Sequence, residues 1–263
     1  MGNAVSIGPS PNNRALGINF VRRVASRSRE RYIDGDEVSP GQDKPDGSTA
    51  RPLPLDPGSK GFPSVCPDGH TVVFHAHREN RHVVVRTDLE GGRPQMLAEG
   101  LFPRCSRKGR WVLFKTEDGL GKVSLDGGEP TLLSKLTCGM FDISPNGEEI
   151  ACLYRSGHSR SSKLAIIPFS GGRPIELVDL PANVEDWLRI SWTPDGRAVA
   201  FVDDESGGVG NVWIQPVTSG QPHQLTHFTS DGIQTFAWSP DGRYLAFSRA
   251  TETTDAVLIT NFR

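Results

Sequence analysis

The chain has 263 residues, of which 36% are hydrophobic, and a formal net charge of −2 at pH 7. This length and composition suit one substantial hydrophobic core, and the near-neutral charge excludes a global attraction to nucleic acid or to an anionic membrane. The four cysteines have no C-x-x-C spacing and are too few for a disulfide scaffold, so the redox compartment stays open.

The sequence contains no recognisable targeting segment. The first thirty residues lack the apolar run of a signal peptide, and no stretch approaches the ~20 apolar residues of a membrane-spanning helix. As written, the chain is expected in the cytoplasm, whereas a missing upstream segment would make it periplasmic.

Residues 1–47 lack the apolar alternation found in the rest of the chain. They are rich in charged residues, proline, glycine and serine, a composition typical of a disordered polar arm. The basic run in this segment has almost no aromatic residues for stacking on bases, so it does not indicate nucleic-acid binding. A second interpretation stays open, because Leu16 and Ile18 are spaced from Asn13 as in the repeats that follow, and the segment would then be a degenerate repeat.

From about residue 48 the chain repeats a short turn motif. The copies are VCPDGHTVVF (65–74), ISPNGEEIACL (143–153), WTPDGRAVAF (192–201), WSPDGRYLAFSR (238–249) and the worn CSRKGRWVLF (105–114). The closing glycines are Gly69, Gly109, Gly147, Gly196 and Gly242, at intervals of 40, 38, 49 and 46 residues. This interval is the length of a β-propeller blade.

A buried strand is expected after each turn. The fifth residue after the glycine is Phe74, Phe114, Cys152, Phe201 or Phe247, and the third and fourth residues are apolar as well. Since residues two apart share one face of a strand, this pattern predicts strands covered on both faces by neighbouring sheets.

A second signature follows later in each of four repeats. It consists of a glycine, a proline two residues on and a leucine five residues on, and its glycines are Gly92, Gly128, Gly172 and Gly220. Apolar alternation precedes each glycine, which predicts a strand that turns there into a short edge strand where proline is tolerated. One repeat therefore has four antiparallel strands, as a propeller blade does.

The predicted fold is an all-β propeller over residues 48–263, with five clear blades and a sixth if residues 1–47 hold a degenerate one. The last copy ends after three strands, at residues 256–263, and residues 50–55 repeat the Arg-Pro-x-x-Leu spacing of the missing fourth strand. We expect this N-terminal strand to complete the last blade and close the ring, because closure removes exposed sheet edges.

The turn motif together with G-G-x-P-x-x-L resembles the repeats of TolB-like, WD-related propellers over residues 48–263. Residues 211–249 and the V-L-I-x-N-F ending also resemble the C-terminal propellers of bacterial serine/threonine kinases and winged-helix regulators. The resemblance implies the fold and a range of functions that includes docking, sensing and substrate gating. The sequence itself has no kinase signature and no winged-helix segment.

Catalytic motifs are missing from the sequence. There is no G-x-S-x-G nucleophile elbow, and the recurring aspartates, Asp68, Asp195 and Asp241, suit turn capping better than glycoside cleavage. We therefore expect no enzyme and no cofactor. Two alternatives stay open: a segment detached from a kinase or a transcriptional regulator, and a five-bladed carbohydrate-processing enzyme.

Metal binding and cysteine chemistry are also not indicated. The histidines His70, His75, His77 and His82 cluster, but no acidic or cysteine ligand is spaced to complete a zinc site, which favours a polar hairpin tip. Cys66, Cys105 and Cys152 occupy repeat positions of small or core residues and are interpreted as unreactive thiols, whereas Cys138 has no assigned place.

The loops that join the second and third strands differ most between copies. In a propeller these loops gather on one face, and variable loops on a rigid ring are where recognition is usually built. The candidate contact residues are His77, Arg78, Tyr154, Arg155, His158, Arg160 and the acidic Asp203, Asp204 and Glu205. We expect a monomeric sensor or scaffold that binds a protein or peptide partner.

Overall fold

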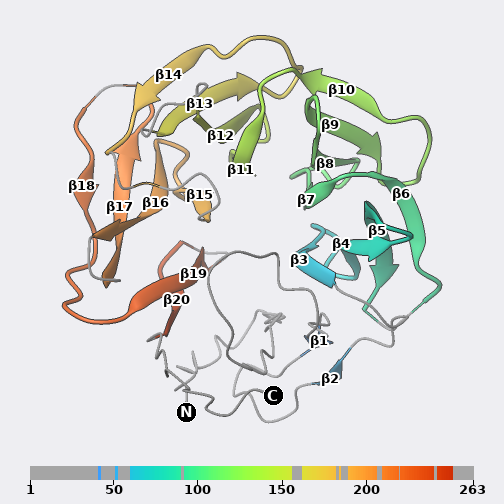
Figure 1. Ribbon diagram of the computed structural model, residues 1–263, viewed down its shortest axis with the longest axis horizontal. Helices are drawn as coiled ribbons and strands as arrows, with labels where there is room; N and C mark the ends of the chain where they lie inside the picture. The colour runs from blue at the N-terminus through green and yellow to red at the C-terminus, as the bar shows by residue number, and fades with distance from the viewer. Residues whose placement is uncertain are drawn as a thin grey trace, which may run out of the picture.

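The computed structural model describes residues 41–42, 51–52, 60–89, 92–155, 162–181, 184, 189–205, 209–218, 220–239 and 242–250. Within these residues the regular structure is entirely β-strand, in four sheets of four strands and two sheets of two. The four-stranded sheets stand around a common axis (Figure 1). The predicted all-β propeller is confirmed.

The strands of each blade follow one another in chain order from the axis outwards (Figure 1). Blade 1 contains β3 (Lys60–Val65), β4 (Thr71–Arg78), β5 (Arg81–Asp88) and β6 (Gln95–Glu99). Blade 2 contains β7 (Leu101–Cys105), β8 (Trp111–Thr116), β9 (Gly119–Ser124) and β10 (Thr131–Ser134). Blade 3 contains β11 (Cys138–Ile143), β12 (Glu149–Arg155), β13 (Ser162–Pro168) and β14 (Glu176–Asp179). Blade 4 contains β15 (Ile190–Trp192), β16 (Ala198–Glu205), β17 (Val209–Pro216) and β18 (His223–Gln224).

Blade 5 is described by two strands, β19 (Gly232–Trp238) and β20 (Leu245–Ala250). Of the expected closing strand only β2 (Arg51–Pro52) is described, and it pairs antiparallel with β1 (Gly41–Gln42). The remainder of the predicted closure, residues 53–55 and 256–263, and most of the polar arm, residues 1–40, lie outside the described residues. Ring closure by the N-terminal strand therefore stays a prediction.

The repeated turn has the same geometry in all five blades. The glycine N–H donates to the carbonyl three residues earlier at 2.9 Å, and each glycine has a φ between 67° and 76°. An L side chain rarely adopts this φ, which explains why glycine recurs there. The turn links the first strand of each blade to the second, so all five turns lie at one end of the ring, here called the turn face.

The apolar residues after each turn form the contacts between blades. Phe114 in blade 2 is 1% exposed and packs with Val73 and Val84 of blade 1. Phe201 in blade 4 is buried with Leu153 of blade 3. Burying one such ring contributes about 1.5–3 kcal/mol, so the repeated phenylalanine is a main source of stability.

The residue at this repeat position is not packed in the same way in every blade. Phe74 is buried among residues of its own blade. Phe247 is half-buried and packs against the core of blade 4 through the cluster that includes Ala200 and Val202. The residue at this position of blade 3, Cys152, is fully buried.

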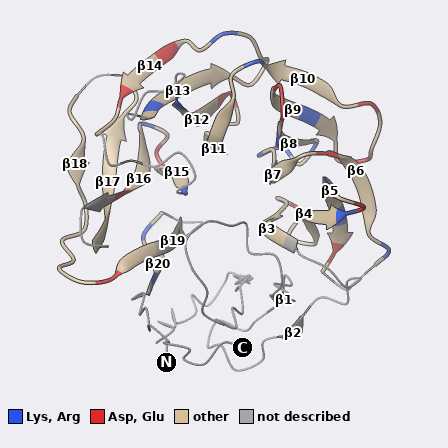
Figure 2. Cartoon of the chain, in the orientation of Figure 1, with Lys and Arg blue, Asp and Glu red and all other residues tan. Residues whose placement is uncertain are grey.

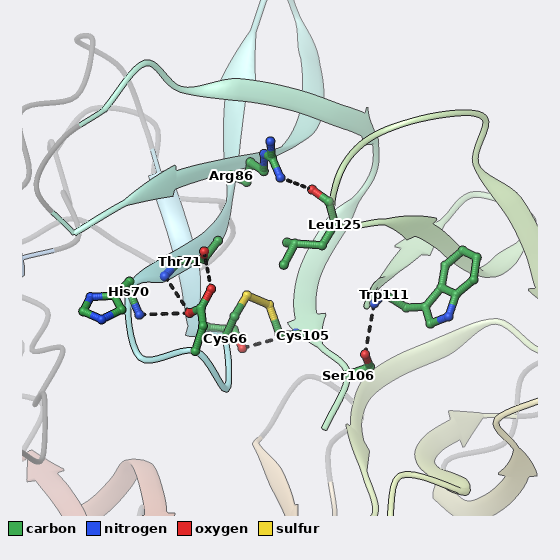
Figure 3. Close-up of a disulfide and its surroundings, with 10 residues drawn as sticks. Cys66, His70, Thr71, Arg86, Cys105, Ser106, Trp111 and Leu125 are labelled. Carbon is green, nitrogen blue, oxygen red and sulfur yellow. Dashed lines mark hydrogen bonds between the residues drawn. A yellow bond between two sulfur atoms is a disulfide. The ribbon is translucent and has the colours of Figure 1, made fainter. Parts of the chain in front are cut away.

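The cysteines are paired, which corrects the interpretation of separate core thiols. Cys66 and Cys105, with Cα atoms 5.2 Å apart, join blade 1 to blade 2 (Figure 3). Cys138 and Cys152, with Cα atoms 5.6 Å apart, join β11 to β12 within blade 3. Both separations are usual for disulfides. The sequence interpretation failed because Cys66 and Cys105 are about one repeat apart, and equivalent positions of successive blades lie side by side only in the folded ring.

Candidate functional site

The hairpins that join the second and third strands lie at the end of the ring opposite the turn face, and we call this end the hairpin face. They connect β4 to β5, β8 to β9, β12 to β13 and β16 to β17. In blade 1 the hairpin closes through Glu79 and Asn80, with φ of 46° and 63°. Two successive positive φ values are typical of the tight type I′ turn that suits the twist of paired strands.

The structure places the predicted contact residues on this face as far as they are described. His77 and Arg78 are exposed at the end of β4, and Tyr154 and Arg155 are half-buried at the end of β12. Asp203 is 5% exposed, and Asp204 and Glu205 pair with Gly210 and Val209 in the ladder of β16 and β17. His158 and Arg160 lie outside the described residues.

The recurring aspartates lie at the opposite end of the molecule. Asp68 Oδ1 accepts hydrogen bonds from the N–H groups of His70 and Thr71 at 2.9 and 2.8 Å (Figure 3). Asp195 Oδ1 accepts from the Thr193 hydroxyl at 2.6 Å and from the Arg197 N–H at 3.1 Å. These bonds, led by that of Thr193, lower the pKa of Asp195. The two aspartates organise the turn backbone, and Asp241 lies outside the described residues.

Histidine and phenylalanine rings gather at the boundary of blades 1 and 2. Phe62 contacts Phe102 edge-on with ring centroids 4.5 Å apart, and His75 lies 5.5 Å from Phe62 and 5.7 Å from Phe102. His82 lies 5.8 Å from His75 and pairs directly with His77 across β4 and β5. We call Phe62, His75, Phe102, His77 and His82 the hairpin-face cluster.

His75 is held as a neutral imidazole. The Phe102 N–H donates to His75 Nδ1 at 3.4 Å, which requires Nδ1 to be unprotonated. Burial, with a smaller contribution from the charge of His82, lowers the pKa of His75 to about 4. The β3 backbone also approaches the ring closely, since a Cβ atom at Gly61 would lie 3.0 Å from His75 Nε2. His75 therefore supports the aromatic pair and stays uncharged at neutral pH.

The residues described here do not assemble a metal site. Among them, no three His, Cys, Asp or Glu side chains are arranged to hold a metal ion. The same residues contain no helix that is long and apolar enough to cross a membrane.

The innermost strands place equivalent side chains around the ring axis. The seventh residue before the turn glycine is Phe62, Phe102, Met140, Arg189 or Thr235, and the fifth is Ser64, Arg104, Asp142, Ser191 or Ala237. The fifth residue projects toward the next blade: Ser64 Oγ accepts from the Cys105 N–H at 3.5 Å, and Asp142 Oδ2 accepts from the Trp192 N–H at 3.0 Å. The seventh residues lie nearer the hairpin face.

Three charged residues occupy these positions in blades 2, 3 and 4 and influence one another electrostatically. We call Arg104, Asp142 and Arg189 the inner-strand cluster. Arg104 is 8% exposed, and Asp142 and Arg189 are half-buried. Burial and the charge of Arg189 lower the pKa of Arg104 to about 10, against the opposing effect of Asp142. Since a guanidinium group stays protonated in proteins, both arginines are charged at neutral pH.

Sequence reasoning missed Phe62, Phe102 and the inner-strand cluster. The turn motif drew attention to the residues after the glycine, whereas these residues precede it. Their fixed distance of five or seven residues from the glycine was the signal that would have found them, because residues two apart on a strand share one face.

Comparisons with known proteins show what the chain resembles. No family model matches it. It is 34% identical over 71 residues to the uncharacterized protein YidR of Escherichia coli and 37% identical over 51 residues to the uncharacterized peptidase YuxL of Bacillus subtilis. It is 33% identical over 106 residues to the tricorn protease homolog 1 of Streptomyces coelicolor. These matches cover 27%, 19% and 40% of the chain but only 16%, 8% and 9% of the relatives.

Solved structures share the fold at low sequence identity. TolB from Acinetobacter baumannii is 16% identical with a TM-score of 0.58, over 81% of this chain and 59% of that one. A TolB-type protein from Agrobacterium tumefaciens is 18% identical with a TM-score of 0.62, over 79% and 76%. An oligogalacturonate lyase in complex with manganese is 12% identical with a TM-score of 0.58, over 80% and 67%. The chain is a TolB-like propeller in fold, whereas the finer resemblance to kinase-linked and regulator-linked propellers is not shown.

The expectation that the protein is not an enzyme is contradicted by these comparisons. Two of the curated relatives are named as a peptidase and a protease, and a lyase is among the structural neighbours. Short segments of the chain are thus similar to proteins that are named as enzymes. The sequence argument failed because it searched this chain for catalytic motifs, although a propeller can share ancestry with an enzyme without carrying its catalytic residues.

Proposed function

We propose that this propeller is a recognition module that binds a peptide or a protein segment on its hairpin face, in an enzyme-related protein. The observation that carries the proposal is the pair Phe62 and Phe102. Both residues have a positive φ, 51° and 54°, although neither is glycine. Such strained conformations cluster at functional sites, and this one recurs at equivalent positions of adjacent blades.

The exposure of this pair supports the same proposal. Phe62 is 37% exposed while its ring contacts Phe102. Aromatic side chains are enriched where proteins bind one another, because they bury a large apolar area at little entropic cost. The exposed His77 and Arg78 and the half-buried Tyr154 and Arg155 supply polar groups on the same face.

The partner is best assigned to the peptide class. Two curated relatives bear the names of a peptidase and a protease. A propeller in such a protein is suited to presenting or admitting a peptide. A sensor propeller belonging to a kinase or a regulator is the alternative that the C-terminal motif resemblance favours.

An oxidising compartment such as the periplasm fits the paired cysteines better than the cytoplasm does. All four cysteines are in disulfides. Disulfides are rare where thiols are kept reduced and persist in secreted and periplasmic proteins.

Peptide selection tests the proposal. The propeller is used to select from a phage-displayed library of 12-residue peptides, and enriched peptides are synthesised and titrated calorimetrically. We expect Phe62→Ser to weaken binding at least tenfold, since it removes the exposed ring. Tyr244→Ser is the matched control, because Tyr244 is 59% exposed beside the glycine turn of blade 5.

Two results would overturn the proposal. One is a selection that enriches no peptide over the empty support. The other is a set of peptides that bind the Phe62→Ser variant as tightly as the parent, which would place binding elsewhere. Substituting Tyr154 and Arg155 with alanine measures how far the site extends over blade 3.

A further inference from the structure

The inner-strand cluster contains two positively charged residues and one negatively charged residue, and Arg104 among them is nearly buried. Arg104 and Arg189 each carry a positive charge, whereas Asp142 is the single carboxylate of the cluster. In the described part of the chain, no ion pair within 4.0 Å and no side-chain hydrogen bond engages either guanidinium group. Asp142 Oδ2 is already occupied by the Trp192 N–H at 3.0 Å, and the Asp142 carbonyl accepts from the indole Nε1–H of Trp192 at 3.2 Å.

This arrangement is costly for the protein alone. A nearly buried charge without a hydrogen-bonded partner loses much of its hydration, so natural proteins usually pair such groups or use them to bind ligands. Asp142 fixes the inner strand of blade 3 to that of blade 4, and its single negative charge balances only one of the two guanidinium charges. The charge that remains is the one an anionic ligand would neutralise.

The position of the two arginines connects them with the hairpin face. Arg104 follows Phe102 by two residues on β7, and Arg189 occupies in blade 4 the position that Phe62 and Phe102 occupy in blades 1 and 2. The protein therefore offers two guanidinium groups farther along the axis to a ligand that contacts the phenylalanine pair. Arg189 directly precedes β15, and Figure 2 shows basic residues in blue on the ribbon.

We propose that Arg104 and Arg189 form an anion site that takes a carboxylate of the peptide bound at the hairpin face. This inference rests on the proposed function and states which peptides the hairpin face would prefer, namely those with a carboxylate. A guanidinium group presents a planar set of N–H donors that matches a carboxylate. Phe62 and Phe102 lie next to the site, so the residue beside the carboxylate is apolar. The carboxylate comes either from the peptide C-terminus or from an Asp or Glu side chain.

Three peptides separate these sources. Ac-Leu-Leu-Phe with a free C-terminus supplies a terminal carboxylate, Ac-Leu-Glu-Phe-amide supplies a side-chain carboxylate, and Ac-Leu-Leu-Phe-amide supplies none. Each is titrated into the whole propeller while the Nε–Hε signals of the arginine side chains are followed by NMR. We expect at least one carboxylate peptide to shift the signals of Arg104 and Arg189, and the uncharged amide to leave them unchanged.

Substitutions test whether binding of the carboxylate peptide depends on the inner-strand cluster. We expect Arg104→Gln to weaken binding of the carboxylate peptide at least tenfold, because it removes one charge from the site. Arg197→Gln is the matched control, since Arg197 is exposed in the turn of blade 4 and should not affect binding. Equal affinity of the acid and amide peptides, absence of any shift, or unchanged binding by Arg104→Gln would overturn the carboxylate site. Binding of selected peptides that still depends on Phe62 would leave the proposed function intact.

A stability measurement keeps the proposal testable if these peptides bind weakly. Arg104→Met should raise the melting temperature of the free protein, because it removes a nearly buried charge from a cluster in which one carboxylate faces two guanidinium groups. Unfolding or marked destabilisation of Arg104→Met would show that the arginine holds the fold together, and would overturn its assignment to a ligand.

Discussion

At the scale of single residues, the fold sets the chemistry of His75. The ring lies against both Phe62 and Phe102 and accepts the Phe102 N–H, so protonation would break a hydrogen bond and place a charge beside aromatic rings. The pKa of about 4 is below the ordinary value of 6.5, so the unfolded chain binds the proton more readily. Stability is complete above pH 6.5 and falls as the pH drops from 6.5 toward 4.

We expect the free energy of unfolding to decrease by about 1–2 kcal/mol between pH 7 and pH 5 because of this residue. Urea denaturation at both pH values measures the change. His75→Gln keeps an acceptor and should flatten the dependence, whereas His223→Gln, at an exposed position, should not. Equal pH dependence of all three proteins would contradict the neutral, buried state of His75.

Residue roles close to a motif could be predicted from the sequence, and those between blades could not. The turn motif implied that aspartate caps its own backbone, and Asp68 and Asp195 hydrogen-bond within their turns. Nothing in the spacing implied that Arg104 and Arg189, which come from different blades, act on each other. Such contacts depend on how blades are placed around the axis, which the period of the repeat does not determine.

At the scale of strands and blades, the repeated phenylalanine predicts where the ring is most sensitive. Phe114 is 1% exposed and lies between two blades, so Phe114→Ala should cost about 3–5 kcal/mol through lost burial and a cavity. Phe247→Ala should cost less, because Phe247 is only half-buried. Chemical denaturation compares both with Tyr244→Ala at an exposed position. A loss for Phe114→Ala no larger than that of the control would contradict the packing between blades.

The disulfide between Cys66 and Cys105 is a second prediction at this scale. It closes a loop of 39 residues, and restricting such a loop in the unfolded chain stabilises a protein by about 4 kcal/mol. The protein purified without reductant should therefore show no reactive thiols in denaturant and four after reduction. Replacing both cysteines by serine should lower the free energy of unfolding. Four reactive thiols in protein produced in an oxidising compartment would refute the pairing.

The four strands of a blade were predictable because each has a local signal. Apolar alternation marks the second and third strands, and glycine followed by proline marks the short outer strand. The disulfides were not predictable, since Cys66 and Cys105 occupy ordinary repeat positions and become neighbours only when blades 1 and 2 pack together. The closing strand at residues 50–55 has the expected spacing, but most of it lies outside the described residues.

At the scale of the whole molecule, the two ends of the ring differ in character. The turn face is built from five nearly identical glycine turns whose polar groups are used within the turns. The hairpin face carries the strained phenylalanine pair, the histidines and the variable loops, with the inner-strand arginines farther along the axis. The varied hairpin face is the end that we propose for peptide binding.

The most direct test is a crystal structure of the propeller with a peptide obtained by selection. We expect the peptide on the hairpin face, with an apolar side chain against Phe62 and Phe102 and a carboxylate within hydrogen-bond distance of Arg104 or Arg189. A peptide bound on the turn face or along the outer strands, with the phenylalanine pair uncovered, would contradict the account.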